Sequence, residues 1–152
     1  MPYHSTIALA LLNIAAIGAY AQPVAQVAQR EALQPGFDMY MASKADPMLA
    51  REFARVTEPI IRSAPWVSAY GTTSPSTMEE LEGRSYYVFH GCKPHECILE
   101  SYTVLYDASA KRITAGAFVQ NEYDGALITK SRITWLGTPD FDSVEVLGKY
   151  LY

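Results

Sequence analysis

The spacing of apolar residues predicts an amphipathic helix that begins at Pro47. Four apolar residues recur three or four positions apart, which places them on one face of a helix. Asp46 and Pro47 have the residue types preferred at the N-cap and the first position of a helix. We therefore expect a helix with one buried face, and the preceding segment 22–38 is also compatible with helix. The residues of the buried face are Leu49, Phe53, Val56 and Ile60.

The central part of the chain has the composition of a β-sheet. Four runs rich in β-branched and aromatic residues are separated by short turn sequences, and Asp124-Gly125 is a favourable hairpin dipeptide. Consecutive strands with short links imply an antiparallel meander. The predicted strands are 84–90, 98–106, 112–120 and 126–135.

Two weaker signals precede these strands. Residues 66–70 could form a short strand, and Ser76 with Glu79 resembles a capping box for one helical turn. Both faces of the strands carry apolar residues, which suggests cover on both sides. A C-terminal helix starting at Thr138-Pro139 and carrying Val144, Leu147 and Leu151 would supply part of it. The fold class predicted is α+β, with about five antiparallel strands sandwiched by helices.

The N-terminus has the pattern of a secretory signal. Residues 7–19 form an apolar run of 13 residues, followed by the small residues Ala19 and Ala21. Because roughly 18 to 20 residues are needed to cross a bilayer, no membrane anchor is expected in the mature form. We predict a signal peptide over residues 1–21, a single domain over 22–152 and a periplasmic location.

Charge narrows the choice of partners. The chain has 12 basic and 16 acidic residues, a formal net charge of −4, which argues against nucleic acid and suits a cationic protein. The sequence contains no nucleophile elbow, phosphate loop or metalloprotease helix motif. We therefore expect neither an enzyme nor a cofactor.

The candidate chemistry is concentrated in a short segment that contains the only two cysteines. An oxidising compartment would pair them into a ring with four intervening residues, worth about 2 kcal/mol of loop-closure entropy. Pro94 stiffens the ring further, and the cation of Lys93 and the imidazole of His95 suit a pocket lined with carboxylates. The segment comprises Cys92, Lys93, Pro94, His95, Glu96 and Cys97.

Metal binding is an alternative reading of the same segment. His90, Cys92, His95 and Cys97 supply four potential ligands for zinc or copper. Their close spacing is unlike that of familiar zinc sites, which separate two ligand pairs by a longer segment. The state of the thiols distinguishes the two readings, because a disulfide removes both sulfur ligands.

The motif Cys-Lys-Pro-His-x-Cys resembles the inhibitory loop of the inhibitor of vertebrate lysozyme family, Ivy. The neighbouring Tyr86-Tyr87-Val88 and Trp135-Leu136-Gly137-Thr138-Pro139, the chain length and the signal support the resemblance. It implies a three-layer α/β/α domain with a central five-stranded antiparallel sheet, in which His95 enters the active site of a c-type lysozyme. Glu96 stands where the family more often has Asp.

The resemblance also sets the range of partners. A c-type lysozyme is the first expectation, and lytic transglycosylases, which also cleave glycan chains, are the alternative. A homodimer is compatible with the resemblance but is not required by it.

Overall fold

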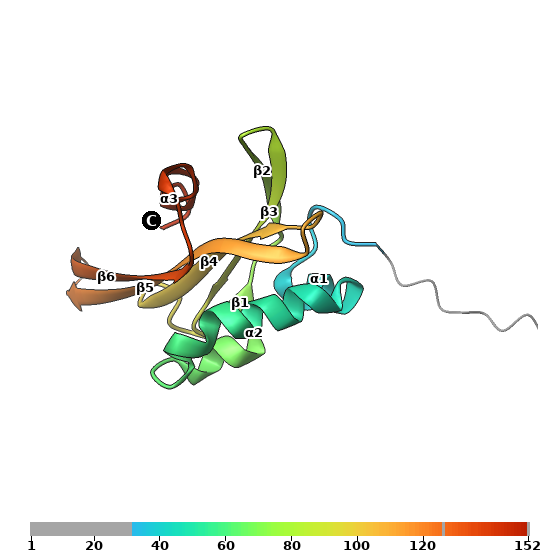
Figure 1. The fold of residues 1–152 in the computed structure, drawn as a ribbon. Coiled ribbons are helices and arrows are strands. Elements are labelled where there is room, and N and C mark those ends of the chain that lie inside the picture. Colours follow the sequence, from blue (N-terminus) through green and yellow to red (C-terminus); the bar gives the residue numbers. More distant parts are fainter. Residues whose placement is uncertain (1–31, 126, 152) are drawn as a thin grey trace, which may run out of the picture.

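A six-stranded antiparallel sheet forms the centre of the fold (Figure 1). The computed structural model describes residues 32–125 and 127–151. The strand order is β1-β3-β4-β5-β6, and β2 pairs with β3. The strands are β1 (Thr72–Thr73), β2 (Thr77–Leu81), β3 (Arg84–Cys92), β4 (Glu100–Asp107), β5 (Arg112–Asp124) and β6 (Leu127–Gly137).

Helices lie on both sides of this sheet (Figure 1). One face packs against the helices that precede the strands, and the other packs against the C-terminal helix. Within the described ranges, no helix is long and apolar enough to cross a membrane. The helices are α1 (Met39–Ala45), α2 (Pro47–Ile61), the 3₁₀ helix η1 (Pro65–Ala69) and α3 (Phe141–Gly148).

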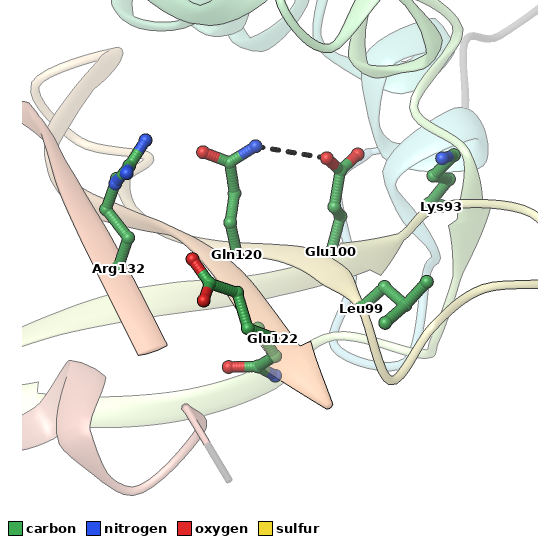
Figure 2. A pocket seen from close by; sticks show the side chains of 7 residues that line it. Lys93, Leu99, Glu100, Gln120, Glu122 and Arg132 are labelled. Carbon is green, nitrogen blue, oxygen red and sulfur yellow. Dashed lines mark hydrogen bonds between the residues drawn. The ribbon is translucent and has the colours of Figure 1, made fainter. Parts of the chain in front are cut away.

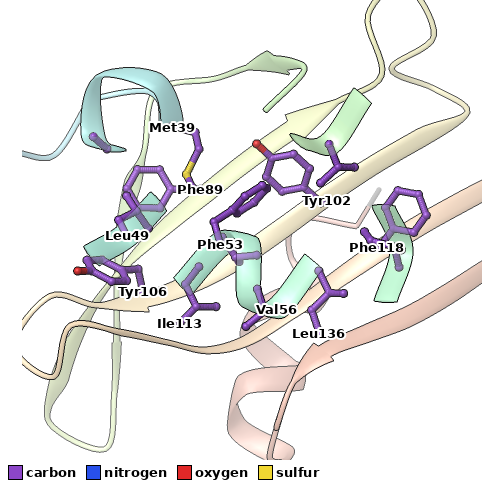
Figure 3. Packing of buried hydrophobic residues seen from close by; sticks show 14 of the residues in the cluster. Met39, Leu49, Phe53, Val56, Phe89, Tyr102, Tyr106, Ile113, Phe118 and Leu136 are labelled. Atoms are coloured by element: carbon purple, nitrogen blue, oxygen red, sulfur yellow. The ribbon is translucent and has the colours of Figure 1, made fainter. Parts of the chain in front are cut away.

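The larger core lies between α2 and the sheet (Figure 3). Because side chains alternate across a strand, Phe89 and Val104 point into this core while Val88 and Leu105 point towards α3. The four predicted residues of α2 are all buried, so the predicted helix and its buried face are confirmed. The four central strands are confirmed as well, with β5 and β6 joined at the predicted hairpin.

A buried polar cluster around Asp46 explains where α2 begins. Asp46 Oδ1 accepts from the amide of Met48 at 3.2 Å, and Oδ2 accepts from Tyr106 Oη at 2.6 Å and Lys111 Nζ at 2.7 Å. Burial alone would raise the pKa of Asp46, but these hydrogen bonds outweigh it and hold the pKa below its usual value. Asp46 therefore links the start of α2 to the sheet in its charged form.

Replacing Asp46 with alanine should lower the free energy of unfolding by about 2 to 4 kcal/mol. The cap contributes about 1 kcal/mol, and the buried Tyr106 hydroxyl would lose its partner at about 1 to 3 kcal/mol. The charged carboxylate makes its full contribution to the free energy of unfolding above the ordinary pKa of about 4. This contribution is lost as the pH falls through the lowered pKa of the folded state. Urea unfolding at pH 7 and pH 3 measures both effects. Asp46→Asn is the control, since asparagine caps equally well, and a loss under 0.5 kcal/mol in the alanine variant would contradict this account.

The edge of the sheet differs from the prediction. About five strands were expected and the sheet has six. Two short strands, β1 and β2, pair with the same edge of β3. The capping box expected at Ser76 and Glu79 is wrong, since residues 77–81 form β2. Glu79 instead accepts from Tyr150 Oη at 2.8 Å and Lys149 Nζ at 3.0 Å, which ties this edge to the end of α3.

Two helical segments also differ from the prediction. The strand expected at 66–70 is wrong, because Pro65 opens η1 and the amide of Tyr70 donates to the carbonyl of Val67 at 2.9 Å. The helix expected from Thr138-Pro139 starts at Phe141, after the N-cap Asp140. Its most buried apolar residues are Val146 and Leu147, while Leu151 lies beyond its end. Helix α1 was not predicted, and the expected signal peptide and most of segment 22–38 lie outside the described residues.

Candidate functional site

The two cysteines close a ring at the end of the central strands. Cys92 is the last residue of β3, β4 begins at Glu100, and a disulfide joins Cys92 to Cys97 with a Cα–Cα distance of 4.7 Å. Cys92 is buried in the sheet, whereas Cys97 is exposed. The predicted disulfide is therefore confirmed, and it connects an exposed tip to the rigid end of a strand.

The ring contains a tight turn with His95 near its apex. The amide of Glu96 donates to the carbonyl of Lys93 at 2.9 Å, with Pro94 and His95 as the central residues. Proline at the second position and a φ of +66° at His95 are the features of a type II turn. A positive φ is uncommon outside glycine, but histidine adopts it more readily than most residues. The turn leaves the side chain of His95 exposed.

A charge pair lies within the ring. Lys93 Nζ and Glu96 Oε2 form an ion pair, and the hydrogen bond to this carboxylate raises the pKa of Lys93. The amide of Lys93 also donates to the carbonyl of Glu100 at 3.0 Å, which closes the base of the ring against β4. Lys93 and Glu96 thus pair with each other across the turn, beside His95.

The segment that leaves the ring is anchored to β5. The backbone amide of Asn121 donates to the carbonyl of Leu99 at 2.7 Å, and its side-chain Nδ2 donates to the carbonyl of Ile98 at 2.8 Å. Both sides of the ring are therefore held by strands. The sequence did not single out Asn121, because nothing in its local pattern shows that it lies beside residues 98–99.

Gly91, immediately before the ring, is required for packing. It lies within β3, and a Cβ atom there would come within 2.5 Å of the ring of Tyr102. Tyr102 is fully buried and its hydroxyl donates to the carbonyl of Tyr70 at 3.0 Å. The strand therefore stays regular up to Cys92, and its end is supported by a buried aromatic residue.

A polar hollow of about 270 Å³ lies beside the ring (Figure 2). Glu100, one of the residues that line it, accepts from Gln120 Nε2 at 3.0 Å and from Trp66 Nε1 at 2.8 Å. Glu100, Gln120 and Arg132 face one another across β4, β5 and β6. The hollow adds charged and amide groups to the same end of the sheet, next to Lys93.

His90 has a separate environment. Its Nδ1 lies 3.0 Å from Thr103 Oγ1 on β4, and burial lowers its pKa, which favours the neutral imidazole. His90 lies two residues before Cys92 on β3 and lines a hollow with Cys97 and Tyr150. Its role here is to pack and hydrogen-bond within the sheet.

The metal-binding alternative does not fit this arrangement. Cys92 and Cys97 are bonded to each other, so two of the four ligands considered from the sequence are unavailable. Within residues 32–125 and 127–151, no group of three or more His, Cys, Asp or Glu side chains is placed to hold a metal ion. Of the candidate residues, the structure brings together those of the ring, while His90 lies within β3 beside Thr103 and shares a hollow with Cys97.

The family model for the inhibitor of vertebrate lysozyme, Ivy, matches residues 49–140, which include β1 to β6 and the ring. No curated protein matches the chain.

Proposed function

Since the chain belongs to the inhibitor of vertebrate lysozyme family, we propose that it is an exported inhibitor of c-type lysozyme. In this proposal the ring Cys92–Cys97 enters the catalytic cleft of the enzyme and His95 contacts the catalytic groups. The observation that carries it is an exposed imidazole near the apex of a covalently closed turn on the end of a rigid sheet.

The chemistry of the target explains why an imidazole is suitable. C-type lysozymes cleave glycan chains with two carboxyl groups, a protonated general acid and an ionised group across the cleft. An imidazole has two ring nitrogens and can hydrogen-bond with both. His95 would therefore occupy the place of the scissile sugar bond, where water is excluded and charge-assisted hydrogen bonds are strong.

The rigidity of the ring favours binding. The disulfide, the proline at position 94 and the ion pair between Lys93 and Glu96 all restrict the turn before it meets the enzyme. A loop that is already ordered loses little conformational entropy when it docks. The anchors at Glu100 and Asn121 extend the same restriction to the base of the ring.

Location and charge are consistent with this function. A signal peptide over residues 1–21 would deliver the remaining chain to the periplasm, where it could meet lysozyme before the enzyme reaches the cell wall. The oxidising conditions outside the cytoplasm maintain the disulfide. The net charge of −4 favours encounter with a cationic enzyme.

The direct test is inhibition of wall digestion by the purified, oxidised protein. We expect it to inhibit a c-type lysozyme in a turbidity assay with bacterial cell walls. Inhibition should reach its maximum at a ratio of one inhibitor molecule to one enzyme molecule. A lytic transglycosylase is assayed beside the lysozyme with the same preparation. Undiminished lysozyme activity at a large excess of inhibitor would refute the proposal, and inhibition of the transglycosylase alone would assign the ring to the cell's own enzymes.

A further inference from the structure

The hairpin of β5 and β6 extends beyond the rest of the sheet. The pairing of β4 with β5 stops at Glu100 and Gln120, whereas β5 and β6 remain paired as far as Asp124 and Leu127. Figure 1 shows this pair of strands projecting past its neighbours. Since β6 is the edge of the sheet, the last residues of the hairpin form a two-stranded ribbon.

The ribbon exposes apolar side chains. Leu127 is 73% exposed and Ile128 43% exposed, and Ile98, which follows the ring, is 60% exposed. A two-stranded ribbon is marginally stable on its own in water, and charged residues usually protect exposed strand edges. Among the described residues of the ribbon, Glu122 and Lys130 form an ion pair, and it does not cover this apolar surface. Ile98 and Ile128 line one hollow, whereas Leu127, which precedes Ile128 in β6, points to the opposite face of the ribbon. We call Ile98 and Ile128 the tip surface.

The tip surface is continuous with the ring. In an antiparallel meander, the connection from β3 to β4 and the connection from β5 to β6 lie at the same end of the sheet. Asn121 links them, because it belongs to β5 and hydrogen-bonds to the carbonyls of residues 98 and 99. Ile98, Ile128 and Cys97 also line a shared hollow of about 350 Å³. An enzyme that receives the ring therefore faces the tip surface as well.

Interface size gives the second reason for assigning the tip surface to the same partner. Stable protein complexes bury about 800 Å² on each partner, contributed by roughly 20 to 30 residues. A ring of six residues supplies only a fraction of this area. The apolar residues beside the ring would add buried area to the interface and would help to exclude water from the contact that the ring makes.

We propose that the tip surface docks on the rim of the lysozyme cleft that the ring enters, so that the ring and the hairpin both contact the enzyme. This inference rests on the proposed function. The ring blocks the catalytic groups, while Ile98 and Ile128 pack against apolar atoms of the rim and slow dissociation.

The test compares two exposed apolar residues at opposite ends of the sheet. Ile128→Asp places a charge in the tip surface, and Phe141→Asp places the same charge at the start of α3, beyond the far end of β6. Phe141 is 81% exposed, so both substitutions are expected to leave the fold intact. Binding to immobilised c-type lysozyme is followed by interferometry for the oxidised wild type and both variants, with thermal unfolding as the check on folding.

We expect Ile128→Asp to weaken binding about tenfold, mainly through faster dissociation, and Phe141→Asp to bind like the wild type. If Ile128→Asp is less stable, Ile98→Asp must show the same loss with wild-type stability. Wild-type affinity in both tip variants, with binding of the wild-type protein itself intact, would overturn the role of the tip surface and leave the proposed function standing. Absence of binding by the wild-type protein would overturn both. Sedimentation of the same samples provides a further outcome: a dimer that the tip variants dissociate, with lysozyme affinity unchanged, would assign the surface to a second copy and overturn the inference.

Discussion

Replacing His95 with asparagine is expected to weaken inhibition of c-type lysozyme by about 30-fold or more. The imidazole is proposed to hydrogen-bond with the catalytic carboxyl groups, and loss of one partner in a buried, charge-assisted contact costs at least about 2 kcal/mol. Asparagine is the substitution of choice because it also tolerates a positive φ, which His95 adopts at +66°. The turn should therefore survive while the imidazole is lost.

The measurement is the inhibition constant of wild-type, His95→Asn and His95→Ala proteins with one c-type lysozyme. His95→Ala is expected to lose at least as much inhibition, since it removes the polar group and also strains the turn. Glu96→Gln is the matched control inside the ring: it removes the charge that faces Lys93 but keeps the imidazole. The role of His95 is wrong if His95→Asn inhibits as strongly as the wild type.

Removing the disulfide is the second change with a large expected effect. In the double variant Cys92→Ala with Cys97→Ala, the turn loses its covalent closure, and we expect inhibition to fall by about tenfold or more. Loop-closure entropy for so small a ring is worth about 2 kcal/mol, so the free energy of unfolding should fall only to a limited extent. The binding affinity should fall more, because an open loop must be ordered when it docks. A genetic change also avoids adding a reductant to the target enzyme.

Two measurements distinguish a loop effect from a folding effect in the double variant. Near-ultraviolet circular dichroism should retain the signal of the packed aromatic residues, among them Trp66 stacked on Tyr102 at a centroid distance of 5.9 Å. The inhibition constant should rise although this signal is unchanged. A fully active double variant would show that the ring does not depend on its disulfide.

The regular elements could be predicted where local pattern and tertiary packing agree. The predicted helix that begins at Pro47 is confirmed because its N-cap and apolar spacing are local features that also fit the core. The capping box at Ser76 and Glu79 failed because pairing with β3 outweighs a local preference, and nothing nearby indicates that partner strand. The strand expected at 66–70 was wrong for two reasons. Pro65 favours a helical start, a local signal that was not used, and Trp66 packs on Tyr102, which lies far along the chain.

The candidate site could be predicted in its residues but not in its geometry. The cysteine spacing and the family motif identify the ring, and the structure confirms its disulfide. The ion pair between Lys93 and Glu96 and the anchor at Asn121 depend on how the turn meets β4 and β5, which no local pattern encodes. The exposed hairpin tip was missed for the same reason, since only the strand register shows that β5 and β6 extend past β4.

The most direct test of the central claim is the structure of the oxidised protein bound to a c-type lysozyme. The account predicts that the Cys92–Cys97 ring lies in the catalytic cleft, with a ring nitrogen of His95 within about 3 Å of a catalytic carboxyl oxygen. A complex in which the enzyme is inhibited while His95 faces solvent would contradict it.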